Sequence, residues 1–459
     1  MEPIKLGICG LGTVGRGTVE VLERNAASIA RRVGAAIEVA HVGSRQSLPQ
    51  LRAAGVQISA DHLAVARDPQ VDILVETIGG TTLARRLVEE AIAQGKHVVT
   101  ANKALLAEHG NALFAAAAAQ GVQIAYEAAV AGGIPIVHAL STGLAANRIN
   151  LVAGIINGTG NFILTEMRDK GQTFAAALAA AQARGYAEAD PAFDIEGTDA
   201  AHKLAILAAL AFGIPLQFDC VFTEGLTELD PQDVQHAAAL GYAIKHLGIA
   251  RRTAAGIELR VHPTLVPREQ PIAQVDGVMN AVLVNADASG PTLYCGAGAG
   301  GDPTASAVLA DVVDLARLVV STRGDKNSGK NGKGVPAARV PACLSDPPAT
   351  VPVLNIADCT TAFYLRFDAK DQAGVLSRIT GLFSDAGLSV EAIQQREPTA
   401  GSQEATIIMI TQRAREWELR RLVQALQGLD ALTSRVVVIR VEDLNCAESP
   451  DEHAQSEEA

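Results

Sequence analysis

The chain of 459 residues is poor in aromatic side chains, cysteine and positive charge. Aromatic residues make up 3% of it, with a single Trp, which argues against an aromatic-lined recognition surface. It has 38 Lys and Arg against 50 Asp and Glu, a net charge of -12, and this argues against nucleic acid as a partner. Six cysteines without CxxC or metal spacing indicate reduced thiols and a cytoplasmic location.

Long apolar runs are missing as well. No stretch of about 18 apolar residues is free of charges or of Gly and Pro, so we expect no membrane span and no membrane partner. The N-terminus enters an apolar strand without a basic region before it, so no signal peptide is expected. The length predicts about three domains.

Strand-length apolar runs alternate with helical patterns in residues 1–130. The predicted strands are 4–9, 37–42, 71–76, 97–101 and 122–127, and the predicted helices are 14–33, 82–94 and 104–120. Such alternation predicts an α/β fold with a Rossmann-type, doubly wound parallel sheet. We expect a helix near 303–321, with Asp302 as its N-cap and Pro303 at its first position, to complete this domain.

The pattern changes at residue 131. Residues 131–322 mix strands (149–156 and 274–285) with helices (161–184, 199–212 and 231–246), which predicts an α+β domain for substrate binding and dimerisation. Residues 323–352 are rich in Lys, Gly, Asn and Pro and read as a linker. The order βαββαβ over 353–443 predicts a ferredoxin-like module, and 444–459 an acidic tail.

The motif GLGTVG directly follows the first predicted strand and opens a helix. Gly10 permits a tight turn, Gly12 lets the backbone approach a pyrophosphate, and Gly15 lets the helix pack on the strand. The phosphates would then lie on free N–H groups at the helix N-terminus. This context predicts dinucleotide binding; the alternative is a glycine-rich turn in an ordinary α/β domain.

The second strand ends in VGSR rather than in an acidic residue. An NAD-specific site usually places Asp or Glu there for the ribose hydroxyls, and Glu38 comes too early. Arg45 could instead pair with a 2′-phosphate, so NADP is favoured over NAD. The alternative is that Arg45 simply faces water.

Two further motifs end central strands, where ligands bind in parallel sheets. TANK places Thr100 and Lys103 there, and a lysine at this edge can act electrostatically or in proton transfer. ETIGG brings Thr77 to the same edge, near the expected nicotinamide. Taken alone, Lys103 is equally compatible with a surface lysine.

The stretch GYAEADPAFDIEGTDAAHKLAIL concentrates five acids before an apolar helix. Asp199 and Lys203 stand one turn apart on one helix face, and Thr198 can cap that helix. Glu188 and Asp194 on the preceding loop could hold an ammonium group, while Lys203 passes a proton to or from a hydroxyl. Lys103 could approach if the domains close. The alternative is a surface ion pair worth about 0.3–0.5 kcal/mol.

Three glycine-containing loops complete the set of candidates. Glu127 and the carbonyls of AYEAAVAGGIPI could hold a small cation, although a hinge with a buried, capped Glu explains the same residues. INGTGN offers N–H groups and Thr159 to a carboxylate. GAGAGGD could approach the cofactor or form a plain tight turn.

Together GLGTVG, VVTANKALLA, AYEAAVAGGIPI, INGTGNFILT, GYAEADPAFDIEGTDAAHKLAIL and GAGAGGDPTASAV resemble the homoserine dehydrogenase family in order and spacing, over about residues 4–321. The C-terminal module resembles an ACT domain, although its turn DQAGVL has Ala373 where Pro is common. The resemblance implies reversible NAD(P)-dependent interconversion of L-homoserine and L-aspartate 4-semialdehyde, on the route to threonine, methionine and isoleucine.

The resemblance also implies residue roles. Lys203 would be the proton donor or acceptor beside Asp199, with a part for Lys103 that the sequence does not apportion. Substrate binding is implied for Glu188, at the amino group, and for Tyr186, Asp194, Gly158 and Thr159. Cofactor contacts are implied for Thr13, Val14, Lys103, Gly185 and Gly298. A monovalent cation, sodium in type, would be bound by Glu127 and the carbonyls of Val130, Gly132 and Ile134.

The ACT-like module implies feedback control by threonine, bound at an interface between two such modules. The alternative is a plain dimerisation role; a homodimer or homotetramer is implied in either case. Two other functions compete. A semialdehyde dehydrogenase needs a nucleophilic cysteine in the cleft, and residues 100–200 contain none. A non-catalytic dinucleotide sensor would not need Asp199, Lys203 and Glu188 together.

Overall fold

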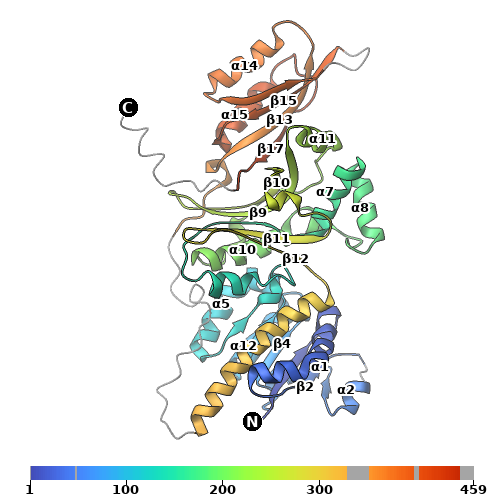
Figure 1. Cartoon of the computed structure of the whole chain (residues 1–459), viewed down its shortest axis with the longest axis vertical. Coiled ribbons are helices and arrows are strands. Elements are labelled where there is room, and N and C mark those ends of the chain that lie inside the picture. Colours follow the sequence, from blue (N-terminus) through green and yellow to red (C-terminus); the bar gives the residue numbers. More distant parts are fainter. Residues whose placement is uncertain (1, 47–48, 328–350, 397–402, 445–459) are drawn as a thin grey trace. The chain divides into compact units, whose positions relative to one another are not determined.

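The computed structural model describes residues 2–46, 49–327, 351–396 and 403–444 (Figure 1). The chain forms two compact units, each made of three segments. Unit 1 comprises Met1–Gly158, Asp199–Val221 and Val278–Val351, and unit 2 comprises Thr159–Thr198, Phe222–Gly277 and Pro352–Ala459. The domain limits expected from the sequence stay predictions, and most of the expected linker and acidic tail lies outside the described residues.

A parallel sheet in unit 1 has the strand order β3-β2-β1-β4-β5-β6. Its strands are β1 (Ile4–Cys9), β2 (Ile37–Gly43), β3 (Gln57–Ser59), β4 (Ile73–Glu76), β5 (His97–Thr100) and β6 (Ile124–Ala125). The order reverses between β1 and β4, which makes the sheet doubly wound and confirms the predicted fold class. The sequence analysis did not predict β3, which has only three residues.

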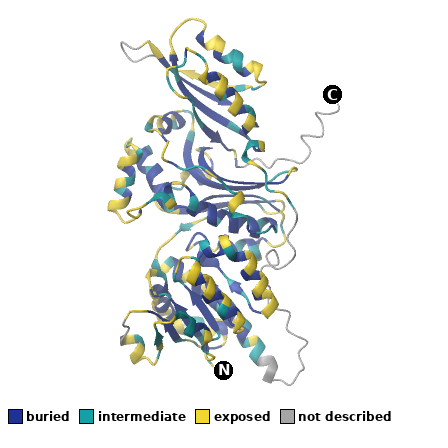
Figure 2. Ribbon diagram, turned by 180° about the vertical axis from the view of Figure 1, so that it is seen from behind, coloured by how far each residue is buried: buried dark blue, intermediate teal, exposed yellow. Residues whose placement is uncertain are grey.

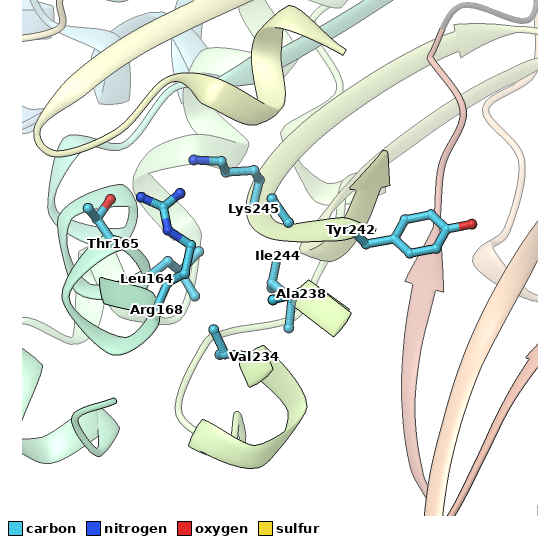
Figure 3. A pocket seen from close by; sticks show the side chains of 9 residues that line it. Leu164, Thr165, Arg168, Val234, Ala238, Tyr242, Ile244 and Lys245 are labelled. Atoms are coloured by element: carbon cyan, nitrogen blue, oxygen red, sulfur yellow. The ribbon is translucent and has the colours of Figure 1, made fainter. Parts of the chain in front are cut away.

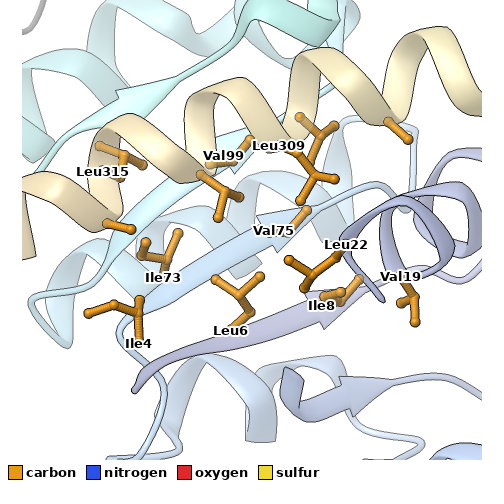
Figure 4. Close-up of a cluster of buried hydrophobic side chains, with 14 of the residues drawn as sticks. Ile4, Leu6, Ile8, Val19, Leu22, Ile73, Val75, Val99, Leu309 and Leu315 are labelled. Carbon is orange, nitrogen blue, oxygen red and sulfur yellow. The ribbon is translucent and has the colours of Figure 1, made fainter. Parts of the chain in front are cut away.

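Helices connect and cover these strands. They are α1 (Thr13–Val33), α2 (Pro49–Ala53), α3 (His62–Arg67), α4 (Thr82–Ala93), α5 (Lys103–Gln120) and α12 (Gly301–Asn327). Figure 4 shows Leu309 and Leu315 of α12 on the side of the helix that faces Val75 and Ile73 of the sheet, in one buried cluster. A helix far along the chain therefore closes the core of the N-terminal sheet. It begins at Gly301, so Asp302 and Pro303 lie inside its first turn and the cap expected at Asp302 is wrong.

The remaining elements of unit 1 come from three separate parts of the sequence. An antiparallel ladder has the order β12-β11-β7. These elements are η1 (Glu127–Ala129), α6 (Ile136–His138), η2 (Ala139–Gly143), β7 (Ile149–Ile155), α10 (Thr198–Phe212), η3 (Phe218–Cys220), β11 (Met279–Ala286) and β12 (Gly290–Ala297). The strand expected at 274–285 therefore starts later, at Met279.

Unit 2 contains a mixed sheet with the strand order β9-β10-β17-β13-β15-β14. Its strands are β8 (Phe222–Thr223), β9 (Tyr242–Arg252), β10 (Ile257–Pro267), β13 (Thr360–Lys370), β14 (Val390–Gln395), β15 (Glu404–Thr411), β16 (Ala414–Arg415) and β17 (Val437–Val441). With α14 (Val375–Asp385) and α15 (Glu416–Gln427), the C-terminal elements follow the predicted βαββαβ order. Figure 2 shows the buried strands and the exposed outer faces of the helices.

Two helix predictions in unit 2 are wrong. The other helical elements here are α7 (Gly158–Lys170), α8 (Phe174–Ala183), α9 (Ala192–Ile195), α11 (Pro231–Ala239), η4 (Pro271–Gln274) and η5 (Ile356–Asp358). The helix expected at 161–184 is broken, because Gly171 takes a positive φ of 62° and Thr173 caps α8 through Ala176 N–H. The helix expected at 231–246 ends at Ala239, before the left-handed Gly241, and β9 follows.

No helix within the described part of the chain is both long and apolar enough to cross a membrane. This agrees with the absence of long apolar runs from the sequence.

Candidate active site

The GLGTVG turn has the shape that a pyrophosphate needs. Gly10 has a φ of 95°, and a Cβ there would lie 2.6 Å from the Thr77 carbonyl oxygen. A Cβ on Gly15 would overlap the Gly10 carbonyl. At Gly12, by contrast, a Cβ would meet no described atom within 4 Å, so the turn is open at this point. The glycines thus differ in their surroundings: Gly10 and Gly15 have no room for a side chain, whereas Gly12 leaves the turn open.

The first turn of α1 adds N–H groups to this open space. Gly12 is the N-cap residue and makes no side-chain cap, and Thr13 and Val14 follow in the first turn. A helix N-terminus without such a cap carries orphan N–H donors and a partial positive charge. The residues present therefore fit a dinucleotide phosphate pair.

The hydroxyl groups of Thr77 and Thr100, two predicted cofactor contacts, both donate hydrogen bonds within the protein at the ends of strands. Thr77 Oγ1 donates to Gly10 O at 2.7 Å, and Thr100 Oγ1 donates to the Glu76 carboxylate at 2.6 Å. Glu76 is fully buried, and burial raises its pKa despite these hydrogen bonds. Arg45 is exposed just beyond β2, whose last residue, Gly43, accepts a hydrogen bond from Gly10 N–H at 3.2 Å.

Two lysines share one buried carboxylate in unit 1. Lys203 Nζ binds Asp199 Oδ2 at 2.7 Å, and Lys103 Nζ lies 3.1 Å from Asp199 Oδ1. Lys203 Nζ also donates to the carbonyl of Ile156 at 2.7 Å. The side chain of Asp199 is 6% exposed and that of Lys203 11% exposed, so the alternative of a surface ion pair is wrong.

The charges of the two lysines dominate the electrostatics of this Lys–Asp–Lys centre. Burial by itself would raise the pKa of Asp199, but the charges of Lys203 and Lys103 hold it well below its usual range. Asp199 is therefore ionised near neutral pH. Both lysines occupy fixed positions on one anion, and this arrangement is suited to proton transfer at a neighbouring hydroxyl.

Sequence reasoning missed two asparagines of unit 1, one at this centre and one at the glycine loop before α12. Asn157 Nδ2 donates to Asp199 Oδ2 at 2.9 Å, and its place in INGTGN was the available signal. Asn280 on β11 is 1% exposed, and its amide fills the space that a side chain on Gly298 would need. No sequence pattern pointed to Asn280, because only the β11–β12 register brings it to the glycine loop.

The predicted substrate residues of unit 2 form a second group. Thr159 Oγ1 binds the Tyr186 carbonyl at 2.8 Å and Asp194 Oδ2 at 3.1 Å. Glu188 is exposed on the same loop, and Gly185 has a φ of 72° with open space around it. The loop thus places polar groups near Thr159. Gly158, next to Thr159 in the chain, belongs to unit 1, where a Cβ on it would lie 2.8 Å from Val278 O.

The predicted cation loop also has unusual geometry. Among the described residues, Ala131 is the one non-glycine with positive φ, at 56°, and Gly132 follows at 47°. Glu127 is 1% exposed, and its carboxylate accepts hydrogen bonds from Val137 and His138 N–H. The described residues contain no metal-like group of three or more His, Cys, Asp or Glu. A cation here would therefore take its further ligands from main-chain carbonyls.

The cation loop lies against the glycine loop before α12. Gly133 N–H donates to Ala297 O at 2.9 Å, and a Cβ on Gly132 would lie 2.5 Å from the Gly298 carbonyl oxygen. Two motifs more than a hundred residues apart therefore meet inside unit 1.

A small cavity in unit 2 is too small to bind a substrate or a cofactor. Figure 3 shows Arg168 and Lys245, which both bind Asp276; the cavity has a volume of about 10 Å³. It has room for no more than a water molecule.

The open glycine turn on a doubly wound sheet and the Lys–Asp–Lys centre define a nicotinamide-dependent oxidoreductase. Family models for the NAD-binding domain of homoserine dehydrogenase, for homoserine dehydrogenase and for the ACT domain match residues 10–127, 135–313 and 363–430.

Whole-chain relatives agree with these models. A homoserine dehydrogenase of Pseudomonas aeruginosa is 55% identical, covering 97% of this chain and 100% of the relative, and one of Neisseria gonorrhoeae is 48% identical with the same coverage. The crystal structure of a homoserine dehydrogenase from Thiobacillus denitrificans is 51% identical, with a TM-score of 0.88, covering 96% of this chain and 99% of that one. The chain belongs to the homoserine dehydrogenase family and is an NAD(P)-dependent oxidoreductase of amino-acid biosynthesis.

Proposed function

We propose that the chain interconverts L-homoserine and L-aspartate 4-semialdehyde at the Lys–Asp–Lys centre of unit 1. The observation that carries this proposal is the buried Asp199 carboxylate with a lysine on each oxygen. When bound, the nicotinamide cofactor supplies the hydride chemistry.

The residues of the chain move and hold the proton. Lys203 Nζ takes the proton of the substrate hydroxyl in the oxidation and returns it in the reduction. Asp199 and the Ile156 carbonyl hold Nζ at 2.7 Å each and fix its direction. Lys103 supports the same carboxylate from its other oxygen, and Asn157 orients it. Lys203 accepts the proton in its neutral form; in the reduction, the charges of Lys103 and of the protonated Lys203 favour negative charge on the reacting oxygen.

The loop of unit 2 supplies substrate recognition. Glu188 and Asp194 bind the substrate ammonium group, and Thr159 and Gly158 contact its carboxylate. Support comes from the hydrogen bond between Thr159 and Asp194, which holds the loop in one conformation. Tyr186 is 44% exposed and offers its ring to the same substrate.

NADP is the proposed cofactor in preference to NAD. β2 ends at Gly43 without an acidic residue, and the exposed Arg45 follows it. An arginine here pairs with a 2′-phosphate, whereas an acid would bind the free ribose hydroxyls. Initial rates with both nucleotides test this; a kcat/KM that favours NAD contradicts it.

A monovalent cation, proposed to be sodium, lies at Glu127 and the carbonyls of Val130, Gly132 and Ile134. The left-handed conformation of Ala131, a non-glycine residue, costs strain, which a functional role would explain. The cation would offset the buried Glu127 charge and stiffen the loop beside Gly298. Exchange of sodium for a bulky organic cation is expected to lower thermal stability; an unchanged melting temperature would remove the cation from the proposal.

The proposal has three further parts. Threonine regulates the chain through the ACT domain, the chain assembles as a homodimer or homotetramer, and it is located in the cytoplasm. The ACT family match supports an amino-acid effector. The four described free cysteines suit a reducing compartment. Size-exclusion chromatography with light scattering tests the assembly; a monomer would contradict it.

Replacement of Lys203 by alanine tests the catalytic proposal. We expect kcat to fall by about 10²–10⁴-fold, the range typical of a lost acid–base group. Reduced-nicotinamide absorbance with homoserine measures the rate. Lys170→Ala is the matched control, because Lys170 pairs with Glu166 at the same helical spacing in unit 2. A near-normal kcat in Lys203→Ala would remove Lys203 from the chemistry.

A further inference from the structure

A buried carboxylate, that of Glu76, lies at the end of β4 in unit 1. Glu76 is 0% exposed, and in the sheet it pairs with Cys9 at the end of β1 and with Thr100 at the end of β5. These positions share the carboxyl edge of the sheet, where ligands bind in doubly wound folds. The proposed mechanism gives Glu76 no role, yet a buried charge is costly unless hydrogen bonds compensate it.

The two oxygens of Glu76 bind two different loops. Oε1 accepts hydrogen bonds from Ile78 N–H at 2.9 Å and from Gly79 N–H at 3.3 Å, in the loop after β4. Oε2 accepts a hydrogen bond from the Thr100 hydroxyl at 2.6 Å, at the start of the loop after β5. Burial raises the pKa of Glu76, whereas these donors favour its ionised form. One carboxylate therefore joins the two loops.

The loop after β4 lies against the pyrophosphate turn. Thr77 N–H donates to Cys9 O at 2.9 Å, and its hydroxyl donates to Gly10 O at 2.7 Å. A Cβ on Gly10 would lie 2.6 Å from Thr77 O and 2.9 Å from Ile78 N. A change in the course of this loop therefore moves the main chain on which the glycine turn rests.

The loop after β5 fixes the start of α5. Thr100 Oγ1 accepts a hydrogen bond from Asn102 N–H at 3.1 Å. The side chain of Asn102 caps α5 by accepting from Leu105 N–H at 3.1 Å. Its amide donates to Gly80 O at 2.7 Å, so Asn102 joins the same two loops a second time.

We propose that Glu76 is a positioning residue that fixes Lys103 of the Lys–Asp–Lys centre relative to the glycine turn. Lys103 is the first residue of α5, directly after the Asn102 cap, and its Nζ lies 3.1 Å from Asp199 Oδ1. Glu76 acts through the two loops rather than by contact with a reactant. The inference rests on the proposed role of Lys103. Such a link matters because a misplacement of about 1 Å can cost about 10²-fold in rate.

Glu76→Gln tests the proposal, because it keeps the size of the side chain but replaces one acceptor oxygen by an amide that donates. We expect kcat with homoserine to fall about 10–100-fold through misplacement of Lys103. The Kd of the reduced nucleotide, measured by the fluorescence of the nucleotide itself, should rise about threefold or more, because the glycine turn loses support.

Asp68→Asn is the matched control in unit 1. Asp68 accepts a hydrogen bond from Gln70 N–H at 2.9 Å and pairs with His41 at 2.8 Å, but it lies before β4 rather than after it. Its loss should lower the melting temperature and leave kcat and the nucleotide Kd at their parental values. A fall in kcat in Asp68→Asn as large as that in Glu76→Gln would overturn the specific role of Glu76.

A double-mutant cycle separates positioning from a general loss of structure. In a chain that already carries Lys103→Ala, Glu76→Gln should lower kcat by less than about threefold, because the group that it positions is gone. A merely structural role would lower kcat by the same factor with and without Lys103, and that result would overturn the proposal.

Asn102→Ser gives a second reading if Glu76→Gln does not fold. Serine keeps a cap on α5 but loses the amide that binds Gly80, so kcat should fall in the same direction and again depend on Lys103. Parental kcat and nucleotide Kd in this variant would overturn the link between the loops.

The outcomes separate the positioning role from the proposed function. If the parent chain oxidises homoserine and Glu76→Gln matches it in kcat and nucleotide Kd, the positioning role is wrong and the proposed function stands. A parent chain that binds the nucleotide without oxidising homoserine would contradict the proposed function. The nucleotide Kd of Glu76→Gln then still tests the support of the glycine turn, and a parental value would overturn it.

Discussion

Three glycines of one short motif illustrate how differently identical residues act. Gly10 makes a left-handed turn, Gly15 lies where any side chain would strike the Gly10 carbonyl, and Gly12 faces open space. The first two are requirements of folding, whereas we propose that the third leaves room for the nucleotide. Mutation can separate these roles.

Gly12→Ala is expected to impair nucleotide binding without loss of stability, whereas Gly15→Ala is expected to lower the stability of the fold. Gly12 has an ordinary φ of -72°, so alanine fits and the free energy of unfolding should change by less than about 0.5 kcal/mol. Its methyl group would still crowd the pyrophosphate and raise KM for the nucleotide. Gly15→Ala should cost about 1–3 kcal/mol through overpacking. Urea unfolding and initial rates check both; a destabilised Gly12→Ala would contradict the open turn.

The proposed catalytic residues were predictable to different degrees. Asp199 and Lys203 follow from helical spacing, because residues four apart share a face. Lys103 follows from its place at the end of a strand. Neither argument reveals that both lysines bind one carboxylate, since that depends on how the start of α5 and the start of α10 lie within unit 1.

At the scale of elements, the strand β9 is the main failure of prediction. Its residues continue an alanine-rich helical pattern, but Gly241 adopts a left-handed conformation and ends the helix. The strand then buries Lys245, whose side chain is 2% exposed and binds Asp276 at 2.9 Å. Arg168 of α7 holds the same carboxylate through two hydrogen bonds of 2.8 Å. One acid thus connects a helix and a strand whose bounds the sequence pattern did not predict.

Asp276→Asn should destabilise the protein by about 1–3 kcal/mol, because it leaves a buried lysine without its counter-ion. Burial raises the pKa of Asp276, but the hydrogen bonds of Arg168 and Lys245 outweigh this and lower it. A lowered carboxyl pKa stabilises the fold above about pH 3.8, and this contribution is lost as the pH falls through the folded-state value.

Urea unfolding at pH 7 and in acid measures this effect. The difference between parent and Asp276→Asn should shrink as the pH drops below about 4, where the parent carboxylate begins to take up its proton. Asp169→Asn is the control, since Asp169 pairs with the same Arg168 but its side chain is 53% exposed. Equal losses in both variants would show that the buried Lys245 does not depend on Asp276 for its stability.

At the scale of the molecule, the C-terminal module is part of unit 2 rather than an appendage. β17 pairs in parallel with β10, and Glu442 beyond it is 2% exposed. Its carboxylate binds Arg251 and Arg260 at 2.6 Å each, and both arginines are buried. The two guanidinium charges lower the pKa of Glu442 against the effect of burial.

Deletion of residues 352–459 should therefore damage the rest of unit 2. It removes Glu442 and leaves two buried arginines with Glu258 as their remaining acid in the described network. Glu442→Gln alone is expected to cost about 3–5 kcal/mol. Soluble yield, circular dichroism and activity of both forms check this. A truncated chain with parental stability would show that the network contributes nothing.

The sequence by itself determined the Rossmann-type sheet, the βαββαβ module and the identity of Lys203, Asp199 and Lys103, because periodicity and motif spacing are local properties. Tertiary structure alone decided that α12 closes the N-terminal core, that two lysines share Asp199, and that Glu76 accepts a hydrogen bond from Thr100. Such contacts join residues far apart in the chain. They arise only when buried surfaces and charges find partners, and no local pattern encodes that choice.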